Sequence, residues 1–164
     1  MFSVKKTIFF SLILILSGCV TKSSIKKENQ ESAFIKIITP KIKYADMGFI
    51  YKGDSWLKVE IYAMGQPVVE FNINGVNICM SSLECMDKSD FNEKMLSEFY
   101  PSTLLENIFR GKAIFNGKNL RKSSSGFIQT IRDNKKYDIT YEVRGKSRKF
   151  YDKINKIKIE VIGR

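Results

Sequence analysis

Apolar and polar residues alternate from Trp56 to Met80, interrupted by the short apolar loop Ala63-Met64-Gly65-Gln66-Pro67. The apolar positions are Leu57, Val59, Ile61 and Ala63 before the loop, and Val69, Phe71 and Ile73 after it. A period of two is typical of strands that bury one face. We therefore predict two antiparallel strands joined by a tight turn. A third strand should follow Asn74-Gly75, a dipeptide that favours a type I′ hairpin turn.

The same alternation occurs in six other segments. Residues 34–38 and 43–51 precede the central strands, and residues 127–132, 137–143, 148–151 and 157–161 lie in the last third of the chain. Turns are expected at Pro40 and at 52–54, and residues 121–125 are expected to be a polar connector. The chain therefore begins and ends in β-structure.

The period changes between these two groups of strands. Asp90 and Glu93 have the spacing of a capping box, and Phe91, Met95 and Phe99 follow at helical intervals. A second helix is expected to begin near 101–103 and to end at Gly111. Strands, two helices and then strands predict an α+β domain in which the helices cover or plug one opening of a strongly curved antiparallel sheet.

The N-terminus has the features of an export signal. Lys5 and Lys6 precede an apolar stretch that is too short to span a bilayer, so residues 1–18 are expected to be a signal peptide. Leu16-Ser17-Gly18-Cys19 resembles the bacterial lipobox, in which the cysteine is lipidated and becomes the mature N-terminus. The alternative is an ordinary signal peptide followed by a chance cysteine. We expect residues 19–33 to be a lipidated flexible tether and residues 34–164 the folded domain.

The charge of the chain restricts its partners. Removing Lys5 and Lys6 leaves 26 basic against 17 acidic residues, a net charge of +9 for the mature chain. Nucleic acid is an improbable partner for an exported lipoprotein, and the basic residues are not interleaved with stacking aromatics. They could contact anionic lipid or an acidic protein, or could simply form a solvated surface. Val20 in place of an aspartate after the lipid site favours the outer membrane over the inner membrane.

The residue types offer little catalytic chemistry. The chain has no histidine, which excludes His-based triads, His general bases and the common zinc sites. Gly111 to Gly117 does not have the spacing of a phosphate loop, and Asp87 with Asp90 is better explained by helix capping. We expect no enzyme activity, no cofactor and no metal. Cys79 and Cys85 are expected to form a disulfide in an oxidising compartment, with two buried free thiols as the alternative.

A family resemblance adds to these expectations. The segment from Leu57 to Phe71, the Asn-Gly hairpin, the helix end Asn107-Ile108-Phe109-Arg110-Gly111 and the late strand 137–141 look like the order of parts in the outer-membrane lipoprotein receptor LolB and its relatives. The resemblance covers most of the mature chain in pattern but few identities. It implies an unclosed β-barrel with helices in its mouth and an apolar cavity for acyl chains.

The resemblance also implies a function. The family accepts lipoproteins from a periplasmic carrier and inserts them into the outer membrane. Met64 and Gly65 match the position of its membrane-insertion loop, where Met64 replaces an exposed leucine. The chain would then be an outer-membrane-anchored monomer facing the periplasm, with the carrier and lipoprotein acyl chains as partners.

The expected cavity lining comes from the apolar positions of strands and helices, although a closed core would show the same alternation. The candidate residues are Trp56, Val59, Ile61, Phe71, Ile73, Ile78, Phe91, Met95, Phe99, Ile108, Tyr141 and Ile159. The second functional hypothesis is a structural or surface-exposed lipoprotein that acts as a protein-interaction module.

Overall fold

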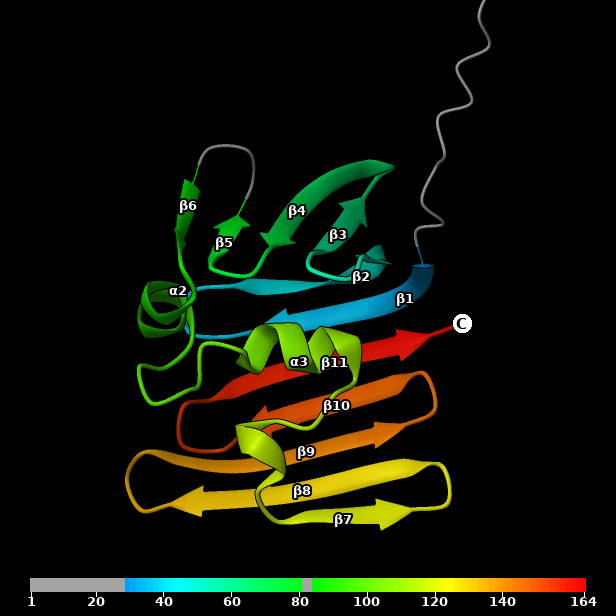
Figure 1. Cartoon of the computed structure of the whole chain (residues 1–164). Helices are drawn as coiled ribbons and strands as arrows, with labels where there is room; N and C mark the ends of the chain where they lie inside the picture. Colours follow the sequence, from blue (N-terminus) through cyan, green and yellow to red (C-terminus); the bar gives the residue numbers. More distant parts are fainter. Residues whose placement is uncertain (1–28, 81–83) are drawn as a thin grey trace, which may run out of the picture.

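The computed structural model describes residues 29–80 and 84–164, which form one large antiparallel sheet and two short α-helices (Figure 1). The strands are β1 (Asn29–Ile38), β2 (Lys43–Lys52), β3 (Leu57–Ala63), β4 (Gln66–Ile73), β5 (Asn77–Met80), β6 (Glu84–Asp87), β7 (Leu120–Ser123), β8 (Gly126–Asp133), β9 (Tyr137–Arg144), β10 (Ser147–Asp152) and β11 (Ile157–Gly163). The helical segments are α2 (Lys88–Met95), α3 (Leu104–Arg110) and a short 3₁₀ turn, η2 (Phe115–Gly117).

The eleven strands follow the order β6-β5-β4-β3-β2-β1-β11-β10-β9-β8-β7. Each half of the sheet is a meander of sequence neighbours, and the halves are joined where β1 pairs with β11 from Ala33↔Gly163 to Ile38↔Lys158. Strands β6 and β7 lie at opposite edges and do not pair with each other, so the sheet is not closed. The predicted α+β class and the unclosed antiparallel sheet are confirmed.

One hydrophobic core lies between one face of the sheet and the helices. Strand β9 shows the pattern clearly, because Tyr137, Ile139, Tyr141 and Val143 are buried and the residues between them are not. Helix α3 contributes Leu104, Leu105, Ile108 and Phe109 to the same core. Figure 1 shows α3 in front of the middle of the sheet, where it contacts β10.

Two edge strands were missed by the sequence analysis. Strand β7 occupies most of the predicted polar connector at 121–125 and pairs with β8 from Leu120↔Gln129 to Ser123↔Gly126. Strand β6 has Cys85 and Met86 between two acidic residues and pairs with β5. Both have only four residues and mostly exposed side chains, so they bury too little apolar surface to produce an alternating pattern. Backbone pairing with a neighbouring strand defines them instead.

The hairpin prediction at Asn74-Gly75 was wrong in its turn type. The Oδ1 atom of Asn74 accepts hydrogen bonds from the backbone N–H groups of Val76 at 3.0 Å and Asn77 at 2.7 Å. This side-chain turn holds a longer loop, and Gly75 does not adopt a positive φ. Two successive residues with positive φ occur instead in the hairpin turn at Met64-Gly65.

The two predicted helices exist, but the first starts earlier and ends earlier than expected. Helix α2 begins at Lys88 and its N-cap is Asp87, which makes no side-chain capping bond, so the predicted capping box at Asp90 was wrong. It ends at Met95, which leaves Phe99 outside the helix. Helix α3 ends as predicted, with Gly111 in the left-handed conformation at φ 68°.

The sheet begins at Asn29, so residues 29–33, assigned above to the tether, form the first half of β1. A charge cluster explains this ordering, because Glu31 accepts hydrogen bonds from Nη1 and Nη2 of Arg148 at 2.6 and 2.9 Å and from Nζ of Lys52 at 2.5 Å. Burial opposes ionisation of Glu31, but the bonds from Arg148 and Lys52 outweigh it and lower the pKa of the Glu31 carboxyl. The polar composition of the segment gave no sign of these distant partners.

Replacing Glu31 with glutamine should destabilise the fold, because it leaves the guanidinium of Arg148, which is 6% exposed, without its carboxylate. We expect the free energy of unfolding to fall by about 3 kcal/mol, measured by urea denaturation. The pKa of Glu31 is lower in the folded state than in the unfolded state. Glu31 therefore contributes its full share of folding stability above the unfolded-state pKa, and this share is lost as the pH falls through the folded-state pKa. Stability of Glu31→Gln should therefore depend less on pH below about 4.5 than that of the parent protein. Equal stability of the two proteins at pH 7 would contradict this role.

Candidate functional site

The most exposed apolar side chain on the described surface lies at the β3–β4 turn. Met64 is 104% exposed, with φ 51°, and Gly65 follows with φ 78°. Ala63 pairs with Gln66, so these two residues alone form the turn. Positive φ at both central positions is the geometry of a type I′ turn, which favours Asn or Gly at the first position. A methionine there is strained by roughly 1 kcal/mol and does not bury its side chain in return.

Other apolar side chains continue the surface behind Met64. Tyr62 pairs with Pro67 across the hairpin, just after an irregularity in the register between Ile61 and Tyr62. Pro67 is exposed, and Val68 is 44% exposed. We call Tyr62, Met64, Pro67 and Val68 the apolar tip. Its two most exposed members in the core-forming apolar classes are Met64 and Val68, at 104% and 44%.

A polar cluster fixes the strands that carry the apolar tip. Nζ of Lys58 lies 2.7 Å from one carboxylate oxygen of Glu60 and 3.2 Å from a carboxylate oxygen of Glu70, and the Tyr62 hydroxyl donates to Glu60 at 2.9 Å. Burial opposes ionisation of Glu60, but the bonds from Lys58 and Tyr62 lower the pKa of its carboxyl. Neighbouring strands are thereby held together behind the turn.

Nine of the twelve predicted lining residues are buried in the core. These residues are Val59, Ile61, Phe71, Ile73, Ile78, Phe91, Ile108, Tyr141 and Ile159, each no more than 2% exposed. Other protein atoms enclose these side chains almost completely, so they do not line a water-accessible space in this structure. Phe71 and Phe91 meet edge to face with ring centroids 6.0 Å apart, as in an ordinary packed interior.

The other three predicted lining residues are not in the buried core. Trp56 and Met95 are half-buried, and Met95 packs against the edge of the core. Phe99 is 43% exposed, and Nζ of Lys136 lies 5.8 Å from its ring centroid. Its expected position depended on a helix reaching residue 99, whereas α2 ends at Met95. Phe99 therefore does not join the interior.

The remaining sequence predictions concern the cysteines and the N-terminus. Cys79 and Cys85 face each other across β5 and β6 and are joined by a disulfide with an S–S distance of 2.00 Å. The signal peptide, Cys19 and the tether up to residue 28 lie outside the described residues. Among the described residues, no helix is long and apolar enough to cross a bilayer. No group of three or more acidic or cysteine side chains in residues 29–80 and 84–164 could hold a metal ion.

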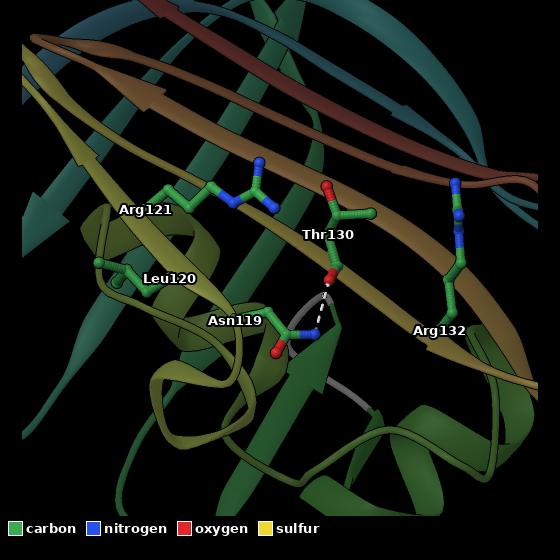
Figure 2. Close-up of a pocket in the computed structure, with 5 residues that line it drawn as sticks. All are labelled: Asn119, Leu120, Arg121, Thr130 and Arg132. Atoms are coloured by element: carbon green, nitrogen blue, oxygen red, sulfur yellow. Dashed lines mark hydrogen bonds between the residues drawn. The ribbon is translucent and has the colours of Figure 1, made fainter.

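A polar pocket of about 520 Å³, which the sequence did not predict, lies beside the β7 edge. Figure 2 shows Asn119 and Thr130 linked at its centre, where Nδ2 of Asn119 donates to the Thr130 carbonyl at 3.1 Å, with Arg121 and Arg132 on either side. Both arginines are exposed, and Nε of Arg132 already donates to Asp138 at 2.9 Å. Such a site can attract anions only weakly, because its cations remain hydrated. The sole sequence signal was the basic run at 118–122.

Relieving the backbone strain at Met64 should stabilise the protein. Changing Met64 to asparagine should raise the free energy of unfolding by roughly 0.5 to 1 kcal/mol, because asparagine adopts positive φ more readily and no packing is lost. Val68→Asn, at a position only partly exposed in β4, is the matched control and should be neutral or destabilising. Denaturant melts of the three proteins would measure the difference. A destabilised Met64→Asn protein would show that Met64 makes packing contacts that its exposure does not reveal.

Comparison with known proteins does not add an identity to this geometry. No family model matches the sequence, and a search of curated proteins finds no match. The features of the chain that bear on its function are the apolar tip, the packed interior, the charges of the domain and the predicted lipid anchor.

Proposed function

We propose that this chain is an outer-membrane-anchored lipoprotein of the LolB-like type, which receives the acyl chains of another lipoprotein from a periplasmic carrier and delivers them to the outer membrane. The observation that carries the proposal is the apolar tip. A fully exposed methionine in a strained turn serves no purpose in folding, whereas it is suited to entering the apolar layer of a bilayer.

The predicted anchor supports this role. Lipidated Cys19 would stand ten residues before Asn29, where the sheet begins. Ten extended residues reach at most about 35 Å, so the domain would remain close to the membrane surface. A tip that acts on the bilayer requires this proximity.

The contacts of the helices support a curved, half-barrel form of the sheet. Phe91 of α2 meets Phe71 of β4, while Tyr100, between the helices, meets Phe150 of β10 with ring centroids 6.0 Å apart. Strands β4 and β10 are separated by four strands in the sheet order. A short helical segment that touches both is best accommodated if the sheet wraps around it, with the helices in the mouth.

The acyl chains would have to enter by displacing α3, since the lining residues are packed. Helix α3 inserts four apolar side chains into the core but has few polar attachments to its surroundings. Glu106 pairs with Lys88 at 2.8 Å, and Nη2 of Arg110 donates to the Trp56 carbonyl at 2.9 Å. An acyl chain that replaces the α3 side chains exchanges one apolar surface for another. Burial of the acyl chain, at about 25 cal/mol per Å² of apolar surface, offsets the free energy needed to displace α3.

A second candidate function is favoured by the closed interior. If the core stays packed, the domain is a protein-interaction module on a lipid anchor, and the apolar tip is part of its contact surface. Nine lining residues with almost no exposure support this alternative. Ligand binding separates the two functions.

Acyl binding should be saturable and limited by the opening of α3. We expect delipidated protein to bind a fluorescent fatty-acid analogue, and Arg110→Gln to speed binding several-fold because it removes the bond to the Trp56 carbonyl. Arg132→Gln, which removes an exposed ion pair elsewhere, is the matched control and should leave the rate unchanged. Stopped-flow fluorescence gives the rates and circular dichroism checks the fold. Absence of saturable binding would favour the interaction module.

Delivery should depend on the apolar tip separately from acyl binding. Met64→Leu should support lipoprotein sorting in the native cell, whereas Met64→Glu should block it because a carboxylate resists entry into the apolar layer. Met64→Asn tests whether loss of the apolar side chain is sufficient. Since Met64 buries nothing, all three proteins should remain folded and bind acyl chains. Membrane fractionation would locate the cargo, and normal sorting with Met64→Glu would refute the delivery role.

A further inference from the structure

A second pocket, of about 410 Å³, lies where β1 begins, beside the ends of β2, β10 and β11. Its charged lining residues are Glu31, Lys52, Lys146, Arg148 and Arg164, and we call it the basic pocket. Neutral polar side chains of Asn29, Gln30 and Ser32 complete its wall. The proposed delivery of acyl chains does not use these residues.

The basic pocket contains more positive charge than its own carboxylate can balance. Glu31 is the only acidic side chain in the wall and is shared by Arg148 and Lys52. Nζ of Lys146 donates to the Arg164 carbonyl oxygen at 2.5 Å. Within the described part of the chain, Lys146 and Arg164 have no ion pair with an acidic side chain. The side chains of the wall therefore include four cations and one carboxylate, an excess of positive charge that attracts anions.

The inner part of this site is held rigidly. Arg148 is 6% exposed, and its two Nη atoms are fixed by the bidentate contact with Glu31. Its Nε is buried and has no hydrogen-bond partner among the described residues. A Cβ on Gly111 would stand 3.1 Å from that atom, so the end of α3 packs directly against the arginine. A guanidinium fixed in this way loses little entropy when an anion binds nearby.

We propose that the basic pocket binds the phosphate of a glycerol-type phospholipid headgroup. Lys52 and Arg148 provide a fixed positive field at the inner end, while exposed Lys146 and Arg164 can close on the phosphate with charge-assisted hydrogen bonds. Asn29, Gln30 and Ser32 can bond to the hydroxyl groups of the glycerol. The pocket is large enough for such a headgroup.

The choice of a membrane lipid over free phosphate rests on the proposed lipid anchor. The basic pocket is formed partly by the first residues of β1, which would be the part of the described domain nearest to Cys19 along the chain. It would therefore meet a surface rich in phosphate groups. Headgroup binding would orient the domain on that surface, a role separate from acyl delivery.

Calorimetric titration of the mature full-length protein in nonionic detergent tests the proposal. The probes are glycerophosphoglycerol, which has the headgroup without acyl chains, and inorganic phosphate. We expect glycerophosphoglycerol to bind at least tenfold more tightly, because inorganic phosphate lacks the hydroxyl contacts. Binding should also weaken with added salt.

The combined Lys146→Gln and Arg164→Gln variant should weaken binding of glycerophosphoglycerol by roughly tenfold or more, as expected for lost charge-assisted bonds. Lys112→Gln with Lys153→Gln removes the same charge from exposed positions outside the pocket and should leave binding unchanged. No saturable binding, or an equal loss in this control, would overturn the site, and equal affinity for inorganic phosphate would overturn the lipid assignment. Met64→Glu should bind the probe normally, so failure of the delivery function is distinguishable from failure of this site.

Discussion

The pairing of β1 with β11 joins two groups of strands that would otherwise form separate sheets. Strands β2 to β6 and β7 to β10 are local meanders that could form from sequence neighbours, but only the central pairing unites them into one sheet. Arg148 and Glu31, 117 residues apart, reinforce this junction, and Lys36 with Glu160 adds a weaker pair at 3.6 Å. Non-local pairing carries a large loop-closure entropy, so this step should limit folding. The core under α3 can be completed only once both halves are in place.

The helices cover the core and are held there mainly by apolar contacts. Their attachment is mainly apolar, through residues such as Ile108 and Phe109, while polar contacts are confined to a few points. The Tyr100 hydroxyl donates to buried Asp152 at 2.5 Å and fixes the connection between α2 and α3 to β10. Burial, with that hydrogen bond, raises the pKa of Tyr100 far above its ordinary value, so the hydroxyl keeps the proton that it donates. In the proposed mechanism, the segment between α2 and α3 stays in place while α3 moves away from the core. An acyl chain can replace the apolar contacts of α3, but replacing the polar contact of Tyr100 would leave a buried polar group unpaired.

The apolar tip and the basic pocket are two places where the chain departs from what folding alone requires. Met64 accepts backbone strain without burying surface, and the basic pocket holds more cations than its carboxylate can neutralise. Departures of this kind often mark sites that act on something outside the protein. Apolar and cationic groups are together suited to a membrane surface, where an apolar layer lies beneath anionic headgroups. We therefore interpret both as adaptations to the same environment.

Local sequence patterns were enough to predict the strands whose apolar residues alternate, the buried face of Val59, Ile61 and Phe71, and the end of α3 at Gly111. Periodicity and left-handed capping are properties of neighbouring residues. The order of elements also predicted an antiparallel sheet with two helices, and the family resemblance implied that the sheet is not closed. Strands β6 and β7 became visible only in the folded structure, because they are defined by backbone pairing with β5 and β8. The same is true of the exposure of Phe99, which lies beyond the end of α2. The basic pocket could not be predicted, since the cluster that defines it joins Glu31, Lys52 and Arg148 from distant strands. Alternation shows which face of a strand is buried, but long-range contacts decide what lies against that face.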